Sequence, residues 1–197
     1  MLLMFVMSSL FLIALAIGQD PISEHMKSAL LWVVIMFSAA IGLGRSFVAE
    51  EERGTVLLLQ LNVRGSQVLA GKLVFNFILL LAVDLVGLGM FTFLLSMQVE
   101  NLPLMLTVLT LGSVGIAGAT TLLSAIIARA SNKGPLLPVL LFPMLIPLLL
   151  SVVRGASQAL EGGLGWSGAE IELTTMAAFA GVVLSASFLL FEYVWTD

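Results

Sequence analysis

Apolar residues fall into six long runs along the chain, separated by short polar stretches. The runs occupy 1–17, 28–47, 73–97, 102–128, 135–153 and 173–195. A helix needs about 20 apolar residues to cross the hydrocarbon core of a bilayer. Strands would leave backbone polar groups unpaired in lipid, which is costly, so an open chain crosses as helices. The pattern predicts an all-α integral membrane protein with six transmembrane helices in one domain, 1–197.

Basic residues are unevenly distributed between the predicted loops. Six of the eight Lys and Arg residues lie in the segment 45–72 and the link 129–133: Arg45, Arg53, Arg64, Lys72, Arg129 and Lys133. The opposite side has Lys27 and Arg154. Since cytoplasmic loops retain an excess of Lys and Arg, both termini are predicted to be cytoplasmic. Four amphipathic rings then fall near the membrane surfaces, the first two outside and the last two inside: Trp32, Trp166, Tyr193 and Trp195.

Composition limits the chemistry that the chain can perform. Hydrophobic residues make up 60% of it and charged residues 10%, against about 25% charged in an ordinary soluble domain. Six crossings leave too few residues for a soluble catalytic domain. The absence of cysteine excludes disulfides, thiolate nucleophiles, Cys-ligated metals and covalent haem attachment through thioethers.

The first run, 1–17, has a second interpretation as a signal peptide. It is short, and Ala14-Leu15-Ala16 resembles the small-residue site at which signal peptidase cuts. A signal peptide normally opens with basic residues, and none precedes this run. We therefore expect a true first span in a chain that has further residues upstream.

The longest polar stretch between predicted spans is the segment 47–72. It opens with an aromatic residue, three carboxylates and a glycine: Phe47, Glu50, Glu51, Glu52 and Gly54. The apolar residues 56–61 are too few to cross a bilayer, which is typical of a helix at the interface or in a partner's groove. Ser66 is a candidate N-cap for the next helix, and Lys72 marks the return into lipid. A solvated acidic run without a partner is the alternative.

Two strings in the sequence resemble known families. The first string, FVAEEERGTVLLLQLNVRGSQVLAGKLV, is similar to the loop between the second and third spans of type-2 ABC exporters. In those exporters this loop couples to the ATPase. The matching positions are Phe47, Glu50, Glu52, Gly54 and Thr55. The second string, SNKGPLLPVLLFPMLIPLLLSVVRGA, has a basic turn followed by a proline-rich fifth span. It resembles the CcmB family, the membrane subunit of haem export in cytochrome c maturation.

The resemblance implies a permease subunit with a type-2 ABC exporter-like fold in a bacterial-type inner membrane. Its expected partners are a CcmA-like ATPase, which carries the ATP, CcmC- and CcmD-like membrane subunits and, indirectly, the haem chaperone CcmE. Haem is expected in the complex rather than on this chain, and no nucleic acid is expected. The alternatives are a general type-2 permease for lipid, drug or polysaccharide, and a non-transporting membrane scaffold.

Two motifs come close to enzymatic signatures and fail. The stretch 65–73 resembles a phosphate-binding loop, but its glycines are one residue too far apart and Leu73 replaces the hydroxyl that holds magnesium. We therefore expect no ATPase activity in this chain and predict that it is not an enzyme. The residues 165–168 match the Gly-x-Ser-Gly of rhomboid-type proteases, but the single histidine, His25, lies in a different loop.

His25 is also a weak candidate haem ligand, because imidazole is a common axial ligand. A single histidine in a loop is more often solvated than metal-bound, so we expect no metal site here. The ten methionines lie mostly inside the spans, where they are typical of flexible packing.

Asp84 is the one ionisable residue deep within a predicted span. It lies about 18 Å along a helix from Lys72, near the bilayer midplane. A carboxylate there costs roughly 2.5–3.5 kcal/mol on insertion scales, so it should face protein or a wet cavity, or be protonated. One interpretation is a polar contact in a subunit interface or substrate path. The other is a protonated Asp bonded to a neighbouring helix, for example to Thr120 or Thr121.

Proline and glycine mark the two spans that follow. Three prolines are candidate helix kinks in the fifth span: Pro138, Pro143 and Pro147. The fourth span contains small residues that allow close helix approach: Gly112, Gly115, Gly118 and Ala119.

Overall fold

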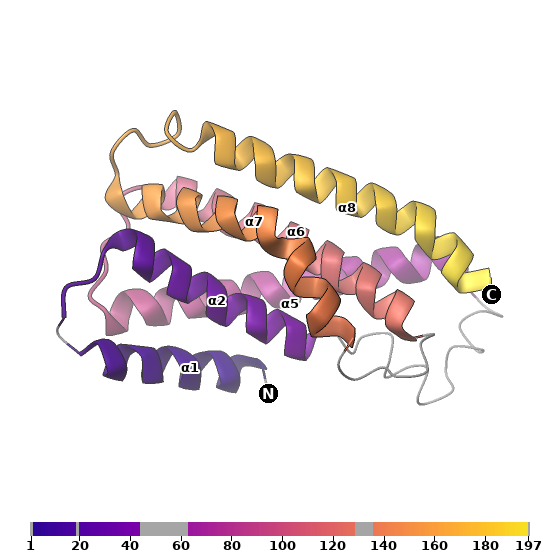
Figure 1. The fold of residues 1–197 in the computed structure, drawn as a ribbon, viewed down its shortest axis with the longest axis horizontal. Helices are drawn as coiled ribbons and strands as arrows, with labels where there is room; N and C mark the ends of the chain where they lie inside the picture. The colour runs from indigo at the N-terminus through magenta and orange to yellow at the C-terminus, as the bar shows by residue number, and fades with distance from the viewer. Residues whose placement is uncertain (1, 19, 44–62, 129–135, 197) are drawn as a thin grey trace.

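Six helices, shown in Figure 1, account for most of the part of the chain that the computed structural model describes: residues 2–18, 20–43, 63–128 and 136–196. They are α1 (Leu2–Ile17), α2 (Glu24–Gly42), α5 (Gly65–Leu94), α6 (Leu102–Ala128), α7 (Leu136–Glu161) and α8 (Glu170–Thr196). The all-α prediction is confirmed. The five helices after α1 are long and apolar enough to cross a membrane. α1 has 16 residues, about 24 Å against a core of about 30 Å, so the sixth crossing stays a prediction.

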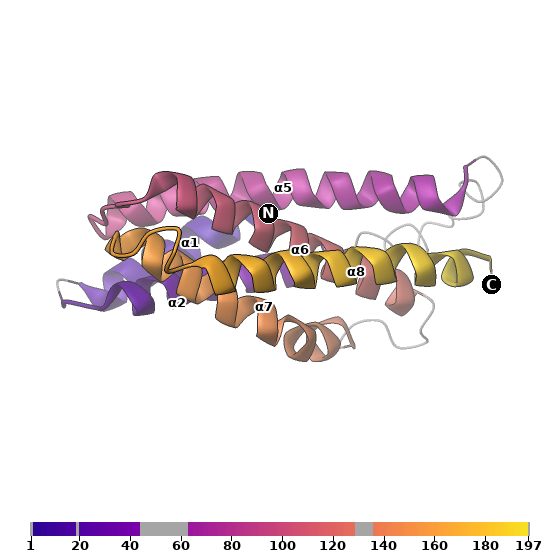
Figure 2. The ribbon, with the colours of Figure 1, turned by 90° about the horizontal axis from the view of Figure 1, so that it is seen from above.

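α6 lies at the centre of the bundle and packs against α2, α5, α7 and α8. Figure 2 shows α5 and α7 on opposite sides of it. Small residues let these neighbours approach closely. A Cβ added to Gly115 would lie 2.7 Å from Leu148 of α7, and one added to Gly118 would lie 3.0 Å from Val183 of α8. The close approach predicted from the glycines of this span is confirmed.

α5 begins at Gly65, eight residues before the predicted apolar span 73–97 and one residue before Ser66, the predicted N-cap. Residues 65–72, assigned to the loop, form its first two turns, and Ser66 lies inside the helix. Arg64 occupies the N-cap position without a side-chain hydrogen bond. The reason is packing, because Leu69 and Leu73 lie one turn apart and are buried against α6 and α8.

α2 and α7 also extend beyond the predicted spans. α2 begins at Glu24 instead of residue 28, because Ser23 caps it: the Met26 backbone N–H donates to Ser23 Oγ at 3.2 Å. α7 runs to Glu161 instead of residue 153, since Arg154 is on its exposed side while the next turns are buried. One charge on the outer face of a helix does not end it.

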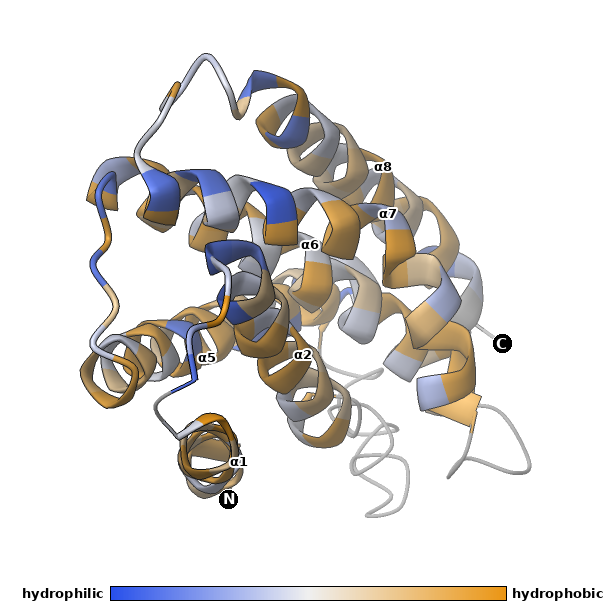
Figure 3. Cartoon of the chain, turned by 60° about the vertical axis from the view of Figure 1, so that its left-hand side comes forward, coloured by the Kyte–Doolittle hydropathy of each residue, from blue (hydrophilic) through white to orange (hydrophobic). Residues whose placement is uncertain are grey.

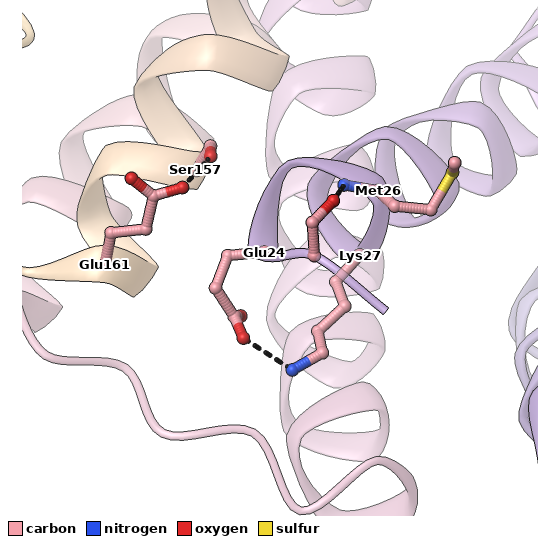
Figure 4. Close-up of polar contacts among 6 residues, drawn as sticks. Glu24, Met26, Lys27, Ser157 and Glu161 are labelled. Carbon is pink, nitrogen blue, oxygen red and sulfur yellow. Dashed lines mark hydrogen bonds and ion pairs between the residues drawn. The ribbon is translucent and has the colours of Figure 1, made fainter. Parts of the chain in front are cut away.

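Polar residues collect at the end of the bundle formed by the connections 18–23, 95–101 and 162–169, as Figure 3 shows for α2, α7 and α8. Figure 4 shows two of the contacts there: Lys27 pairs with Glu24 at 2.6 Å, and Ser157 donates to Glu161 at 2.9 Å. The connections are also joined by the Asn101 backbone N–H, which donates to the Ala159 carbonyl at 3.0 Å. This end is therefore polar, and a backbone hydrogen bond ties the connection 95–101 to α7.

The opposite end contains the start of α5 and the ends of α6 and α8. A second, smaller apolar cluster joins them: Leu69, Leu73, Ala125, Ala128 and Phe191. We call this cluster the distal core. Along the chain, Ala128 is the last described residue before 129–135, and Leu69 follows the end of the segment 44–62 by seven residues.

Candidate functional site

The predicted ATPase-coupling residues fall in the segment 44–62, outside the described residues. They are Phe47, Glu50, Glu52, Gly54 and Thr55. The helices on either side of this segment are described: α2 ends at Gly42, and α5 begins at Gly65. The coupling role of the five residues stays a prediction.

Asp84 lies on α5 with its side chain fully buried, at 0% exposure. Ser113 Oγ on α6 lies 2.6 Å from Asp84 Oδ2. The other oxygen, Oδ1, has no hydrogen-bond partner among the described residues. The contact with a neighbouring helix agrees with one of the two interpretations of Asp84, but the partner is Ser113 and not Thr120 or Thr121.

A second polar contact joins the same two helices. Asn76 Nδ2 donates to Thr121 Oγ1 at 2.8 Å, and both side chains are buried. Asn76 and Asp84 lie eight residues apart on α5, and so do their partners on antiparallel α6. Eight residues make just over two helical turns, so both pairs lie on the facing sides of the two helices. We call the two pairs the α5–α6 polar contacts.

Sequence reasoning missed Asn76 and Ser113. Hydroxyl side chains recur along α6, so Ser113 does not stand out there, and Asn76 carries no charge that would mark it within its span. The eight-residue spacing of polar residues in two consecutive spans was the signal that could have indicated a shared interface.

Trp32 lies in the core, at 0% exposure, rather than at the outer membrane surface as expected. Its ring packs directly against Gly112 of α6. A Cβ at position 112 would overlap the ring, so only glycine fits there in this arrangement. The indole Nε1 has no hydrogen-bond partner among the described residues. Trp166, at 49% exposure, and Tyr193, at 74%, are exposed; the side chain of Trp195 is not described.

The prolines of α7 occupy two kinds of position. Pro143 and Pro147 lie inside the helix, where each removes a backbone hydrogen bond. Figure 1 shows α7 changing direction in its first half, which contains both. Pro138 lies in the first turn, where the backbone N–H groups have no helical partner and a proline is tolerated.

The other candidate residues are not gathered into a site. His25 is exposed in the first turn of α2, and no group of three or more His, Cys, Asp or Glu residues able to hold a metal occurs in the described ranges. Ser167 donates to the Leu164 carbonyl at 2.8 Å within the turn before α8. The stretch 65–73, which resembles a phosphate-binding loop in sequence, is part of helix α5.

No curated protein and no solved structure matches the chain. A family model described as the CcmB protein matches residues 1–191. The match includes all of α1 to α7 and most of α8, together with the segment 44–62. The chain therefore belongs to the CcmB family.

Proposed function

We propose that this chain is the membrane permease subunit of an ABC-type complex, in which a separate CcmA-like ATPase drives haem handling and release of a haem chaperone of the CcmE kind. The observation that carries the proposal is the family match over residues 1–191. The CcmB family is one of haem-exporter permease subunits in cytochrome c biogenesis. The spanning-length helices agree with a multi-pass inner membrane protein.

In this proposal the ATPase docks on the segment 47–72. Its acidic start, Glu50 and Glu52, would pair with basic residues of the ATPase, and Gly54 would let the chain turn after them. CcmC- and CcmD-like subunits would surround the bundle within the membrane. Haem would be held by the complex as a whole.

The position of α5 supports this docking. Two residues separate the segment 44–62 from the start of α5 at Gly65. α5 then continues for 30 residues, about 45 Å. Its first turns are held by the distal core, and its middle by the α5–α6 polar contacts. A displacement at the docked loop would therefore be passed along one stiff helix to the centre of the bundle.

The test of docking is the recovery of the ATPase with this chain. We expect the double variant Glu50→Ala/Glu52→Ala to lower the amount of ATPase that copurifies by roughly tenfold or more, since truncating one partner of an interfacial charge pair costs about 2 kcal/mol or more. Coupled ATP hydrolysis should fall with it. Glu170→Ala is the matched control, because Glu170 is exposed at the opposite end of the bundle. Unchanged recovery with the double variant would contradict docking and favour the membrane scaffold.

The proposal also requires the distal core to lie on the cytoplasmic side, with both termini. The chain has no cysteine, so single cysteines report orientation without background. Gly163→Cys, in the exposed turn after α7, should react with a membrane-impermeant maleimide in intact spheroplasts. Arg64→Cys, exposed before α5, should react only after the membrane is permeabilised. The reverse labelling pattern would overturn the orientation.

A further inference from the structure

The two α5–α6 polar contacts differ in the group that α5 contributes: an amide in one and a carboxyl group in the other. In the first, Asn76 Nδ2–H donates to Thr121 Oγ1 at 2.8 Å, and Thr121 Oγ1 donates to the Ala117 carbonyl of its own helix at 2.6 Å. An amide NH₂ group can only donate. The hydrogen bonds therefore run in one direction, from α5 to the hydroxyl and from the hydroxyl to the α6 backbone.

The second contact has the same heavy-atom arrangement. Ser113 Oγ lies 2.6 Å from Asp84 Oδ2 and 2.7 Å from the Leu109 carbonyl oxygen. Both distances are typical of O–H···O hydrogen bonds. A serine hydroxyl has one hydrogen, and a carbonyl oxygen has none. One serine hydrogen can point well at only one of two acceptors this close; where a hydroxyl shares its hydrogen, as Thr120 does between two carbonyls, one contact is longer, at 3.1 Å. A hydrogen on Asp84 would complete the second contact of Ser113.

The other hydroxyls on these helices show where the serine hydrogen goes. In α6, α7 and α8, eight other hydroxyls donate to the carbonyl four residues earlier, the usual bond for Ser and Thr in a helix: Thr107, Thr110, Thr120, Thr121, Ser151, Thr174, Thr175 and Ser187. Ser113 has the same geometry toward Leu109. If the Ser113 hydrogen makes this backbone bond, the contact with Asp84 needs a hydrogen on Oδ2 of Asp84.

The surroundings of Asp84 agree with a neutral side chain. Its second oxygen, Oδ1, is buried without a hydrogen-bond donor among the described residues. One turn further along α5, Gly87 faces apolar side chains of α1 and α2, Val6 and Leu31. No ion pair joins Asp84 to a basic residue of the described ranges, and an ionised carboxylate without a counter-charge is far more costly than an unpaired oxygen of a neutral acid.

We infer that Asp84 is a buried proton-binding site: a neutral carboxylic acid that keeps its proton, donates a hydrogen bond to Ser113 Oγ, and joins α5 to α6 as the amide of Asn76 does. Asp84 is thus a hydrogen-bond donor in the bundle and not an anion that attracts a cation. The inference does not depend on the ATPase partner or on haem.

Infrared spectroscopy of the purified chain in lipid at neutral pH tests the proton directly. We expect a C=O stretching band of a protonated carboxylic acid that Asp84→Asn removes and that Glu161→Gln, at an exposed carboxylate, leaves in place. Ser113→Ala should retain the band and shift it to higher wavenumber, because the acid loses its acceptor. Absence of the band from the unmodified chain would overturn the inference, and so would its persistence in Asp84→Asn or its loss in Ser113→Ala.

Unfolding gives a second readout. Asp84→Asn supplies an N–H donor in the place of the acid, so its unfolding midpoint in detergent should match that of the unmodified chain. Asp84→Leu has no donor and should unfold at a lower denaturant concentration. A large loss of stability in Asp84→Asn, with Asp84→Leu no worse, would contradict the donor role.

Discussion

Gly112→Ala is expected to lower the stability of the bundle by about 1–3 kcal/mol, the usual cost of inserting a methyl group into a well-packed core. The added Cβ would overlap the Trp32 ring of α2 and lie 3.1 Å from Val152 Cγ1 of α7. The Trp32 side chain is fully buried, so it has no free space into which to move. Titration with a denaturing detergent, followed by tryptophan fluorescence, measures the loss.

Gly89→Ala is the matched control for this substitution. Gly89 also lies inside a helix, but no atom lies within 4 Å of its added Cβ, and alanine is favoured over glycine in helices by about 0.8–1.0 kcal/mol. This variant should be as stable as the unmodified chain or more stable. Trp32→Leu should reduce the cost of Gly112→Ala, because it removes the ring that the methyl group meets. Equal losses for the two glycine variants would contradict the packing explanation.

Leu69→Asp is expected to prevent the distal core from forming. Leu69 is fully buried against Ala125 of α6 and Phe191 of α8, and an unpaired carboxylate in such a position costs several kcal/mol. The start of α5 would then detach from its neighbours. We expect little monodisperse protein on size-exclusion chromatography in detergent, and little ATPase recovered with what remains.

Gln67→Asp is the control for Leu69→Asp, because it adds the same negative charge to α5 at an exposed position. Gln67 lies two residues earlier in the same helix and is exposed, so the same carboxylate there stays solvated. Its elution profile should match that of the unmodified chain. If Leu69→Asp elutes normally, the distal core does not hold α5 in place and the proposed path from the loop to the bundle centre loses its support.

The distribution of apolar residues was sufficient to predict helices, but not where they end. Ser66 was predicted as the N-cap of the helix before the third span, yet α5 begins at Gly65 with Arg64 at the N-cap position. Arg154 was placed outside the fifth span, yet α7 continues for seven residues beyond it. A helix continues as long as its backbone bonds are satisfied and one face remains buried, and a single charge on the exposed face interrupts neither.

The buried polar residues were only partly predictable. Asp84 stood out because a carboxylate is rare in an apolar span, so the sequence indicated that it needs a partner. Identifying Ser113 required the register of α5 against α6, which depends on how all the side chains at their interface fit together. The same holds for Trp32, whose aromatic ring is typical of a membrane surface but here fills the space above a glycine.

The amino-acid sequence by itself determined that the protein is a membrane protein built of helices and that it cannot use cysteine chemistry. These properties depend on transfer free energies and on backbone hydrogen bonding within each segment, which are local. The tertiary structure alone decided that Asp84 faces Ser113, that Asn76 faces Thr121, and that Trp32 packs on Gly112. Those pairings follow from the rotation and register of neighbouring helices, and only the packing of the whole bundle sets them.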